Sequence, residues 1–326
     1  MTAAASDLLG AEALSPLAGS PLVLLAPCDP RPPGGVRVAV GRAGELPALD
    51  PADYDGLVTT APDAPAPWVS VAAGRIEAQL AAVRQGAAHS PLASAMLARL
   101  LRMGEALPFD TALELESLAY SALLGGDEFA RWLAARGTVA DGEQAAVPVR
   151  YERAGDRVTL TLASPGNRNA MTAAMRDALY EALVNVLEDP GAPQVVLRAE
   201  GKCFSTGGAL GEFGSARDLA AAHVIRTQRS CARVLERLGD RAEVHLHGAC
   251  IGSGAEVPMA AARRLAAPDA LFQLPELRMG LIPGAGGTVT FARAIGRHRL
   301  LWLVLGGFRL NAAQALRWGL IHGLVP

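Results

Sequence analysis

Glu256 and Glu276 are the residues of this sequence whose type and spacing most clearly suggest chemistry. Both lie in the segment from His247 to Thr288, and each borders a glycine-rich turn, GACIGSG before the first and GLIPGAGG after the second. Such turns expose backbone N–H groups that stabilise negative charge on an oxygen, and a glutamate can carry a proton. The segment therefore predicts acid–base chemistry beside a stabilised oxyanion.

Local structure must position these groups. The glycine turn predicts a helix with Ser253 and Glu256 in its first turn, where Pro258 is tolerated, and the proline before Glu276 predicts an extended or turn conformation. A simpler interpretation stays open on these residues alone. A glutamate near a helix start is commonly a surface residue favoured by the helix dipole, and glycines permit tight turns.

Composition excludes several classes of protein. The chain has 326 residues, 51% hydrophobic and 19% charged, which predicts a folded protein of one large domain or two modest ones. A net charge of −2 gives no reason to expect a nucleic acid partner. Lys202 is the only lysine and lies outside GAGG, so the sequence has no Walker-type nucleotide loop.

The four cysteines, Cys28, Cys203, Cys231 and Cys250, show no C-x-x-C spacing, so we expect free thiols in a reducing cytosol and no metal site. The first twenty residues lack the basic start and apolar run of a signal peptide. No run of about 18 apolar residues indicates a membrane span. A cytoplasmic location is expected.

The chain divides into four parts by pattern. Short apolar runs between prolines and glycines predict a small α/β region over residues 1–75, and helical periodicity begins at Ile76. Alternating strands and helices later in the chain indicate an α/β layered fold. The predicted parts are residues 1–75, a helical segment at 76–137, a polar linker at 138–147, and the core at 148–326.

Three helix boundaries follow from local signals. Thr111–Glu114 has the form of a capping box, T-x-x-E, and DEFARWLAAR is followed by Gly137, a residue suited to end a helix. After the loop GKCFSTGGALGEF we expect one long helix that runs through Arg237.

Residues 148–326 resemble the crotonase (enoyl-CoA hydratase/isomerase) superfamily. The match rests on SPGNRNAMTAAM, on GKCFSTGGALGEF, and above all on the segment from Gly248 to Thr288, which keeps the glycine turn, the glutamate after it, PEL and GLIPGAGGT in order. The resemblance implies a core of ββα spiral turns, a homotrimer or hexamer, acyl-CoA thioester as substrate and partner, and no cofactor besides it.

The resemblance also implies roles for residues. The backbone N–H groups of Gly208 and Ser253 would form the oxyanion hole, with Glu256 and Glu276 as catalytic residues. The family's loop commonly has an aspartate where Ala209 stands, so the substrate or activity can differ. The positions expected to bind substrate are Lys202, Phe204, Ala209, Gly252 and Gly284.

The family's usual helical tail, which covers the acyl pocket, does not follow GLIHGLVP in this sequence. The segment from His89 to Arg136 is similar to that tail. We expect it to cover the core from its N-terminal position, as in a permuted crotonase or a remnant of a duplicated one. Arg99 or Arg102 would then take the place of a lysine that contacts CoA phosphate.

The predicted function is hydration of a 2-enoyl-CoA in fatty acid metabolism, with Glu276 protonating the α-carbon and Glu256 assisting the water. Two alternatives stay open. One is another enolate reaction, such as isomerisation, dehydration or cofactor-independent oxygenation. The other is a scaffold that binds CoA without turnover.

Overall fold

The computed structural model describes residues 15–17, 21–27, 29–30, 35–44, 46–139 and 142–325. The expectations for Cys28 and for most of the first twenty residues concern positions outside these ranges. Within the described ranges, no helix combines the length and apolar character needed to cross a bilayer.

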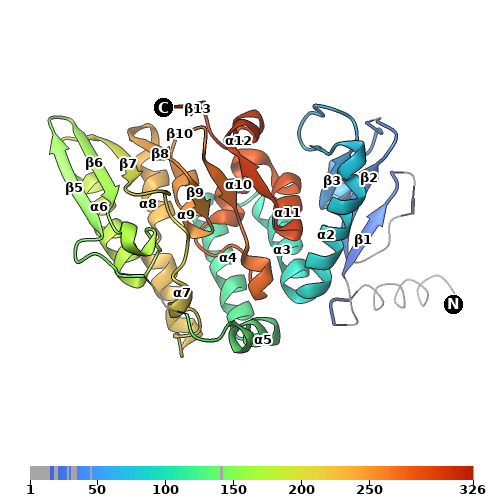
Figure 1. Cartoon of the computed structure of the whole chain (residues 1–326), viewed down its shortest axis with the longest axis horizontal. Coiled ribbons are helices and arrows are strands. Elements are labelled where there is room, and N and C mark those ends of the chain that lie inside the picture. Colours follow the sequence, from blue (N-terminus) through green and yellow to red (C-terminus); the bar gives the residue numbers. More distant parts are fainter. Residues whose placement is uncertain are drawn as a thin grey trace.

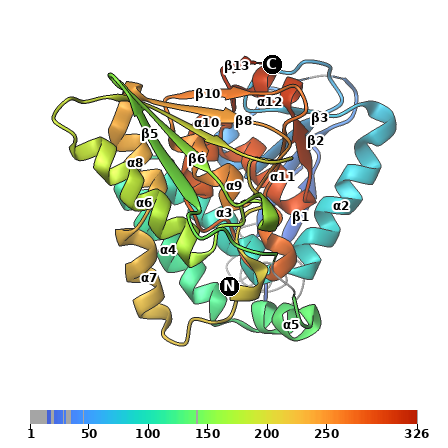
Figure 2. The ribbon, with the colours of Figure 1, turned by 60° about the vertical axis from the view of Figure 1, so that its left-hand side comes forward.

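The largest sheet has six strands in the order β13-β10-β8-β7-β6-β5 (Figures 1 and 2). Apart from the antiparallel hairpin of β5 and β6, each strand pairs in parallel with the next one recruited along the chain. Because each return to the sheet adds a parallel neighbour, the chain winds as a spiral rather than as a meander. The strands are β5 (Val149–Ala154), β6 (Arg157–Leu162), β7 (Gln194–Ala199), β8 (Ala242–Leu246), β10 (Arg263–Ala266) and β13 (Gly323–Leu324).

A smaller sheet of three strands, in the order β12-β11-β9, takes two of its strands, β9 and β11, from the segment that carries the two glutamates. In it β11 pairs in parallel with β9 and antiparallel with β12. The chain leaves β9 directly into the glycine turn and leaves β11 directly into the Glu276 turn, so this sheet sets the distance between the two turns. Its strands are β9 (Ala249–Ile251), β11 (Leu271–Gln273) and β12 (Arg309–Asn311).

The helices of the core connect the strands of these sheets and pack against them. Between the β7 and β8 strands the structure has two helices where the sequence analysis expected one. The break falls at Arg229 and Ser230, because the Ser230 side chain accepts the N–H of Arg233 and starts a new helix. The core helices are α6 (Ala173–Glu188), α7 (Leu219–Gln228), α8 (Cys231–Leu238), α9 (Ser253–Glu256), α10 (Gly287–Ile295), α11 (Arg297–Gly306) and α12 (Ala312–Trp318).

The N-terminal region contains a sheet of four parallel strands in chain order, β1-β2-β3-β4, at the opposite end of the molecule from β5 (Figure 1). Its two longest apolar runs, PLVLLAP and GVRVAVG, contain β1 and β2 as the sequence predicts. Each strand is again the parallel neighbour of its predecessor, so this region repeats the winding of the core on a smaller scale. The strands are β1 (Leu22–Leu25), β2 (Val36–Gly41), β3 (Gly56–Thr59) and β4 (Val69–Ser70).

Four helices connect this sheet to the core: α2 (Ile76–His89), α3 (Pro91–Gly104), α4 (Phe109–Leu124) and α5 (Asp127–Arg136). The α5 helix has the predicted bounds, with Gly137 after it at φ 68°. The capping box predicted at Thr111–Glu114 is wrong. Pro108, whose ring fixes φ, precedes a helix that has already begun at Phe109, and no side chain caps it.

Packing is continuous across the predicted linker. One hydrophobic cluster contains strand residues of the N-terminal sheet, residues of α2 and α3, and residues of all parts of the core. The α2 helix crosses α11 so closely that a Cβ at Gly86 would lie 2.0 Å from the carbonyl oxygen of Leu305. The predicted linker at residues 138–147 therefore separates two stretches of sequence that share one hydrophobic core. Burial of that core stabilises both stretches together.

Polar contacts reinforce this junction at the start of α11. Arg297 donates to the carbonyl of Tyr54 at 2.7 Å, and Arg299 donates to that of Trp68 at 3.1 Å. Arg102 is bound by the buried carboxylate of Asp55 through both nitrogens of its guanidinium edge. Arg102 is therefore committed to the N-terminal sheet rather than free to bind a phosphate, which corrects the expectation for this residue; Arg99 is exposed.

Candidate active site

Two backbone N–H groups, those of Gly208 and Ser253, are free to bind an oxygen. At Gly208 the parallel bridge to Met171 uses the neighbouring groups, because Met171 donates to Gly207 and Ala209 donates to Met171. Ser253 is the first residue of α9, so its N–H has no acceptor within the helix. Neither group donates to any other described residue.

The loops that carry these two groups lie against one another. A Cβ at Gly207 would lie 2.5 Å from the carbonyl oxygen of Ile251, so only glycine permits this approach. Gly252 has a φ of 50°, which turns the chain from β9 into α9 and aims the Ser253 N–H outward. Two free donors on adjacent loops are the arrangement that stabilises a developing oxyanion.

Glu276 lies directly beside this pair. It follows Pro275 in a 3₁₀ turn (Glu276–Met279), as the sequence predicts for a residue after a proline. A Cβ at Gly252 would lie 2.7 Å from Oε1 of Glu276, and the other oxygen, Oε2, is buried with no hydrogen-bond partner among the described residues. Burial raises the pKa of Glu276 well above its usual value, and the charges of Glu256 and Glu116 raise it further. This shift favours the protonated form of the carboxyl, and Oε2 is available for a substrate.

Glu256 is held at the start of α10. Its Oε2 accepts the N–H groups of Ala285 at 2.7 Å and Gly287 at 2.9 Å. Burial raises the pKa of Glu256 to about 7, although these two hydrogen bonds favour the charged form. A carboxyl with a pKa near neutrality can accept or release a proton without a large driving force.

A third buried carboxyl, Glu116 of α4, binds the same turn. It accepts the N–H groups of Gly286 at 2.7 Å and Thr288 at 2.8 Å, and the Thr288 hydroxyl at 2.6 Å. Burial raises the pKa of Glu116 to about 8, helped by the charge of Glu256. The four successive N–H groups of residues 285–288 thus alternate between a carboxyl of the core and a carboxyl of the N-terminal helices, at a helix N-terminus that favours negative charge.

The N-terminal helices also fix the Glu276 turn. Ser90, between α2 and α3, donates to the carbonyl of Leu277 at 2.7 Å. Glu128 of α5 accepts the first N–H groups of α3, from Leu92 and Ala93, and a Cβ at Gly280 would collide with Glu128. The residues from His89 to Arg136 therefore contact both glutamate turns within the same chain, which agrees with a covering role for this segment.

Tyr120 of α4 completes the covering. A Cβ at Gly284 would lie 2.3 Å from the Tyr120 ring, so the ring packs directly on the glycine turn. Burial raises the pKa of the Tyr120 phenol, and all three carboxyls add to that shift. Tyr120 is therefore near Glu116, Glu256 and Glu276 and remains neutral at physiological pH.

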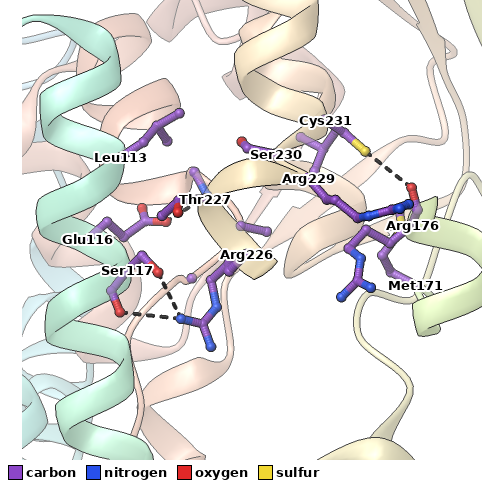
Figure 3. Close-up of a pocket in the computed structure, with 14 residues that line it drawn as sticks. Leu113, Glu116, Ser117, Met171, Arg176, Arg226, Thr227, Arg229, Ser230 and Cys231 are labelled. Carbon is purple, nitrogen blue, oxygen red and sulfur yellow. Dashed lines mark hydrogen bonds between the residues drawn. The ribbon is translucent and has the colours of Figure 1, made fainter. Parts of the chain in front are cut away.

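A cavity of about 90 Å³ lies between α4, α6, α7 and the turn at residues 284–286. Figure 3 shows its wall, with Glu116 and Ser117 on α4 facing Arg226 of α7. The break between α7 and α8 forms the opposite side. Glu256 and Glu276 do not line this cavity but lie beyond the turn that it touches. Its lining residues are Leu113, Glu116, Ser117, Met171, Arg176, Arg226, Thr227, Arg229, Ser230, Cys231, Val257, Gly284, Ala285 and Gly286.

The residues predicted to bind substrate lie in different surroundings. Gly284 lines the cavity, and Gly252 contacts Glu276. Phe204 is 1% exposed and packs in the hydrophobic core, Ala209 is buried, and Lys202 is exposed. Among the described side chains, no group of three His, Cys, Asp or Glu residues is arranged to bind a metal.

Sequence reasoning missed Glu116, Tyr120 and Arg226. One signal was available for the first two, because Leu113, Glu116 and Tyr120 repeat at helical spacing, which puts a carboxyl on a face that is otherwise suited to burial. A charged residue on a buried helical face requires a partner. Its partner, the turn at residues 285–288, could not be identified from spacing along the chain.

Comparison with known proteins gives the family. The enoyl-CoA hydratase/isomerase family matches residues 155–326, and the chain belongs to it. A probable enoyl-CoA hydratase of Rhodobacter capsulatus is 33% identical over 179 residues, which cover 55% of this chain and 68% of that protein. A probable enoyl-CoA hydratase of Bacillus subtilis is 32% identical over 164 residues, and the match spans 50% of this chain and 63% of that protein.

Solved structures agree. The enoyl-CoA hydratase of Thermoplasma volcanium superposes with a TM-score of 0.51 at 29% identity, covering 55% of this chain and 72% of its own. The enoyl-CoA hydratase of Bacillus anthracis superposes with a TM-score of 0.50 at 28% identity, and the match covers 55% of this chain and 70% of that one. The predicted α/β fold with a crotonase-like core is confirmed, and the relatives' names support a crotonase-type reaction on an acyl-CoA.

Proposed function

We propose that this protein adds water to the double bond of a 2-enoyl-CoA thioester. The observation that carries the proposal is the buried Glu276 carboxyl, whose Oε2 has no hydrogen-bond partner among the described residues, beside the two free N–H groups of Gly208 and Ser253. An acid beside an oxyanion site is what protonation at the carbon next to a thioester carbonyl requires.

In the proposed reaction the thioester oxygen accepts hydrogen bonds from Gly208 and Ser253. Glu256 accepts a proton from water as the water oxygen bonds to the β-carbon, and the electrons of the double bond move onto the thioester as an enolate. Glu276 then donates its proton to the α-carbon, which restores the carbonyl. The product is a 3-hydroxyacyl thioester, and the two carboxyls return to their starting states by proton exchange with solvent.

The test is hydration of crotonyl-CoA, followed by loss of the absorbance of the enoyl thioester, in the wild type, Glu276→Gln and Glu77→Gln. Glu77 is an exposed glutamate of α2 and serves as the matched control. We expect measurable turnover in the wild type and the control. No turnover of crotonyl-CoA or of longer 2-enoyl thioesters by the wild type would reject hydration.

Isomerisation of a 3-enoyl-CoA to the 2-enoyl form is a second candidate, favoured by one observation. Oε2 of Glu256 accepts two N–H groups, whereas Oε2 of Glu276 has no hydrogen-bond partner among the described residues. One carboxyl with an oxygen left for the substrate is enough for a reaction that moves one proton between two carbons and uses no water. Appearance of enoyl absorbance from a 3-enoyl-CoA, without hydration, would select this reaction.

A further inference from the structure

Three arginines line the cavity, and they differ in their partners. Arg176 pairs with Asp177 at 2.8 Å. Arg229 lies 3.4 Å from both Asp177 and Glu181. These carboxylates offset the charge of two of the three guanidinium groups.

The third, Arg226, has no carboxylate within ion-pairing distance in the part of the chain that the structure describes. One nitrogen, Nη1, donates to the Ser117 hydroxyl at 2.8 Å, the Ser121 hydroxyl at 3.0 Å and the Ser117 carbonyl at 3.3 Å. The guanidinium lies 4.6 Å from the centre of the Tyr120 ring. Its remaining N–H groups make no hydrogen bond with a described residue. Burial lowers the pKa of Arg226, so water only partly solvates its charge.

Glu116, the carboxyl that shares this cavity, does not supply the missing charge. Both its oxygens are already occupied by donors of the turn at residues 286–288. Burial raises its pKa to about 8, which reduces the negative charge that it carries at neutral pH. Arg226 is thus a fixed, half-buried cation whose neutral partners set its orientation and leave its charge unmatched.

We propose that Arg226 binds a carboxylate at the far end of the acyl group, so that the preferred substrates are monothioesters of dicarboxylic acids. This inference rests on the proposed binding of acyl-CoA and specifies its substrate class. A guanidinium edge binds a carboxylate through two parallel hydrogen bonds. The Ser117 and Ser121 contacts at Nη1 fix the guanidinium and leave the edge formed by Nε and Nη2 for the carboxylate.

An acyl carboxylate fits this position better than a CoA phosphate does. The cavity contains Arg226 together with Glu116 and Gly284, residues that border the proposed reaction centre. Its volume of about 90 Å³ is far below the roughly 300 Å³ at which pockets begin to hold ligands of drug size. A space of this size suits the end of a short acyl chain better than a nucleotide diphosphate.

The experiment compares binding of saturated thioesters that cannot be hydrated. Isothermal titration of the full chain is performed with glutaryl-CoA against valeryl-CoA, with adipyl-CoA against hexanoyl-CoA, and with free CoA. The members of each pair differ in a terminal carboxylate or methyl. We expect the carboxylate member to bind at least about tenfold more tightly in one or both pairs, as a buried charge-assisted hydrogen bond gives.

Variants locate the effect. Arg226→Gln should reduce the preference to less than about threefold, Arg226→Lys should retain part of it, and Arg42→Gln, an exposed arginine of the N-terminal region, should leave it as in the wild type. Equal binding within both pairs by the wild type overturns the proposal, and this result needs no folded variant. An equal loss of free CoA and glutaryl-CoA affinity in Arg226→Gln overturns it too, because Arg226 would then bind a CoA phosphate.

The outcome is separable from that of the proposed reaction. A carboxylate preference that depends on Arg226 supports this inference even if the wild type fails to hydrate any 2-enoyl-CoA. Hydration of crotonyl-CoA with no carboxylate preference in binding supports the proposed function and rejects the inference.

Discussion

The core at residues 148–325 and the helices at residues 76–136 meet at the same site but bring different things to it. The core provides the free N–H groups of Gly208 and Ser253 and the carboxyl of Glu276. The helices provide Ser90, Glu116 and Glu128, whose hydrogen bonds end on backbone groups and, for Glu116, also on the Thr288 hydroxyl. The groups suited to react thus come from one region, and the contacts that hold them in position come from the other.

The largest effect should come from the core. Glu276→Gln removes the transferable proton but keeps the shape of the side chain, so we expect kcat for crotonyl-CoA hydration to fall about a hundredfold or more. The enoyl absorbance assay measures it. Activity within tenfold of the wild type would show that the carboxyl with the free oxygen is not the acid.

The dependence of stability on pH tests the buried carboxyls together. The pKa of Glu116 is about 8 in the folded chain and near 4.5 when exposed, so the folded state binds more protons between these values. The protonated Glu116 carboxyl makes its full contribution to the free energy of unfolding below pH 4.5, and this contribution is lost as pH rises through 8. We expect Glu116 alone to lower the free energy of unfolding in urea by about 2 kcal/mol from pH 6 to pH 8, and the raised pKa values of Glu256 and Glu276 lower it in the same direction.

Glu116→Gln should flatten that dependence. His298, whose pKa burial lowers, acts in the opposite direction near pH 6, so the difference between variant and wild type isolates Glu116. Identical slopes in the two proteins would mean that Glu116 is ionised when folded.

Loss of an ion pair where the N-terminal sheet meets the helices should lower the free energy of unfolding more than loss of an exposed ion pair does. Asp55→Ala leaves Arg102 without its carboxylate, with the Arg102 side chain 35% exposed and Asp55 2% exposed. We expect a loss of about 2 kcal/mol in the free energy of unfolding, less than for a fully buried pair because water reaches the arginine. The matched control, Glu77→Ala, breaks the exposed pair with Arg42 and should cost under about 0.5 kcal/mol. Equal losses would show that the junction is no more than surface contact.

The smallest effect distinguishes positioning from reaction. Glu116→Gln replaces one hydrogen-bond acceptor by a donor that faces the N–H groups at residues 286–288, so the turn that holds Glu256 loosens. We expect kcat to fall about tenfold, well short of the loss in Glu276→Gln. A loss as large as that of Glu276→Gln would move Glu116 into the reacting set, and Glu116→Asp should then fail to restore activity.

The sequence predicted the reacting groups of the core but not the contacts that the helices at residues 76–136 make with them. The turns that carry Ser253 and Glu276 are determined by neighbours along the chain, glycine with positive φ in one case and proline in the other, so local chemistry was enough to place them. The role of Glu116 depends on three donors of Gly286 and Thr288, which lie far along the chain, and helical periodicity carries no information about them. The break before Ser230 was missed because one serine cap outweighed a continuous helical pattern.

The alternation of two carboxyls along residues 285–288 has a consequence for synthesis. The chain is made from its N-terminus, so α4 leaves the ribosome about 160 residues before the turn that binds Glu116, a delay of roughly 10 to 30 s at ordinary elongation rates. During that time the side chains of Phe109, Leu113 and Glu116 lack α10 and the turn before it, which cover them in the folded chain. A nascent chain of this protein should therefore depend on chaperone protection of α4 until α10 has emerged.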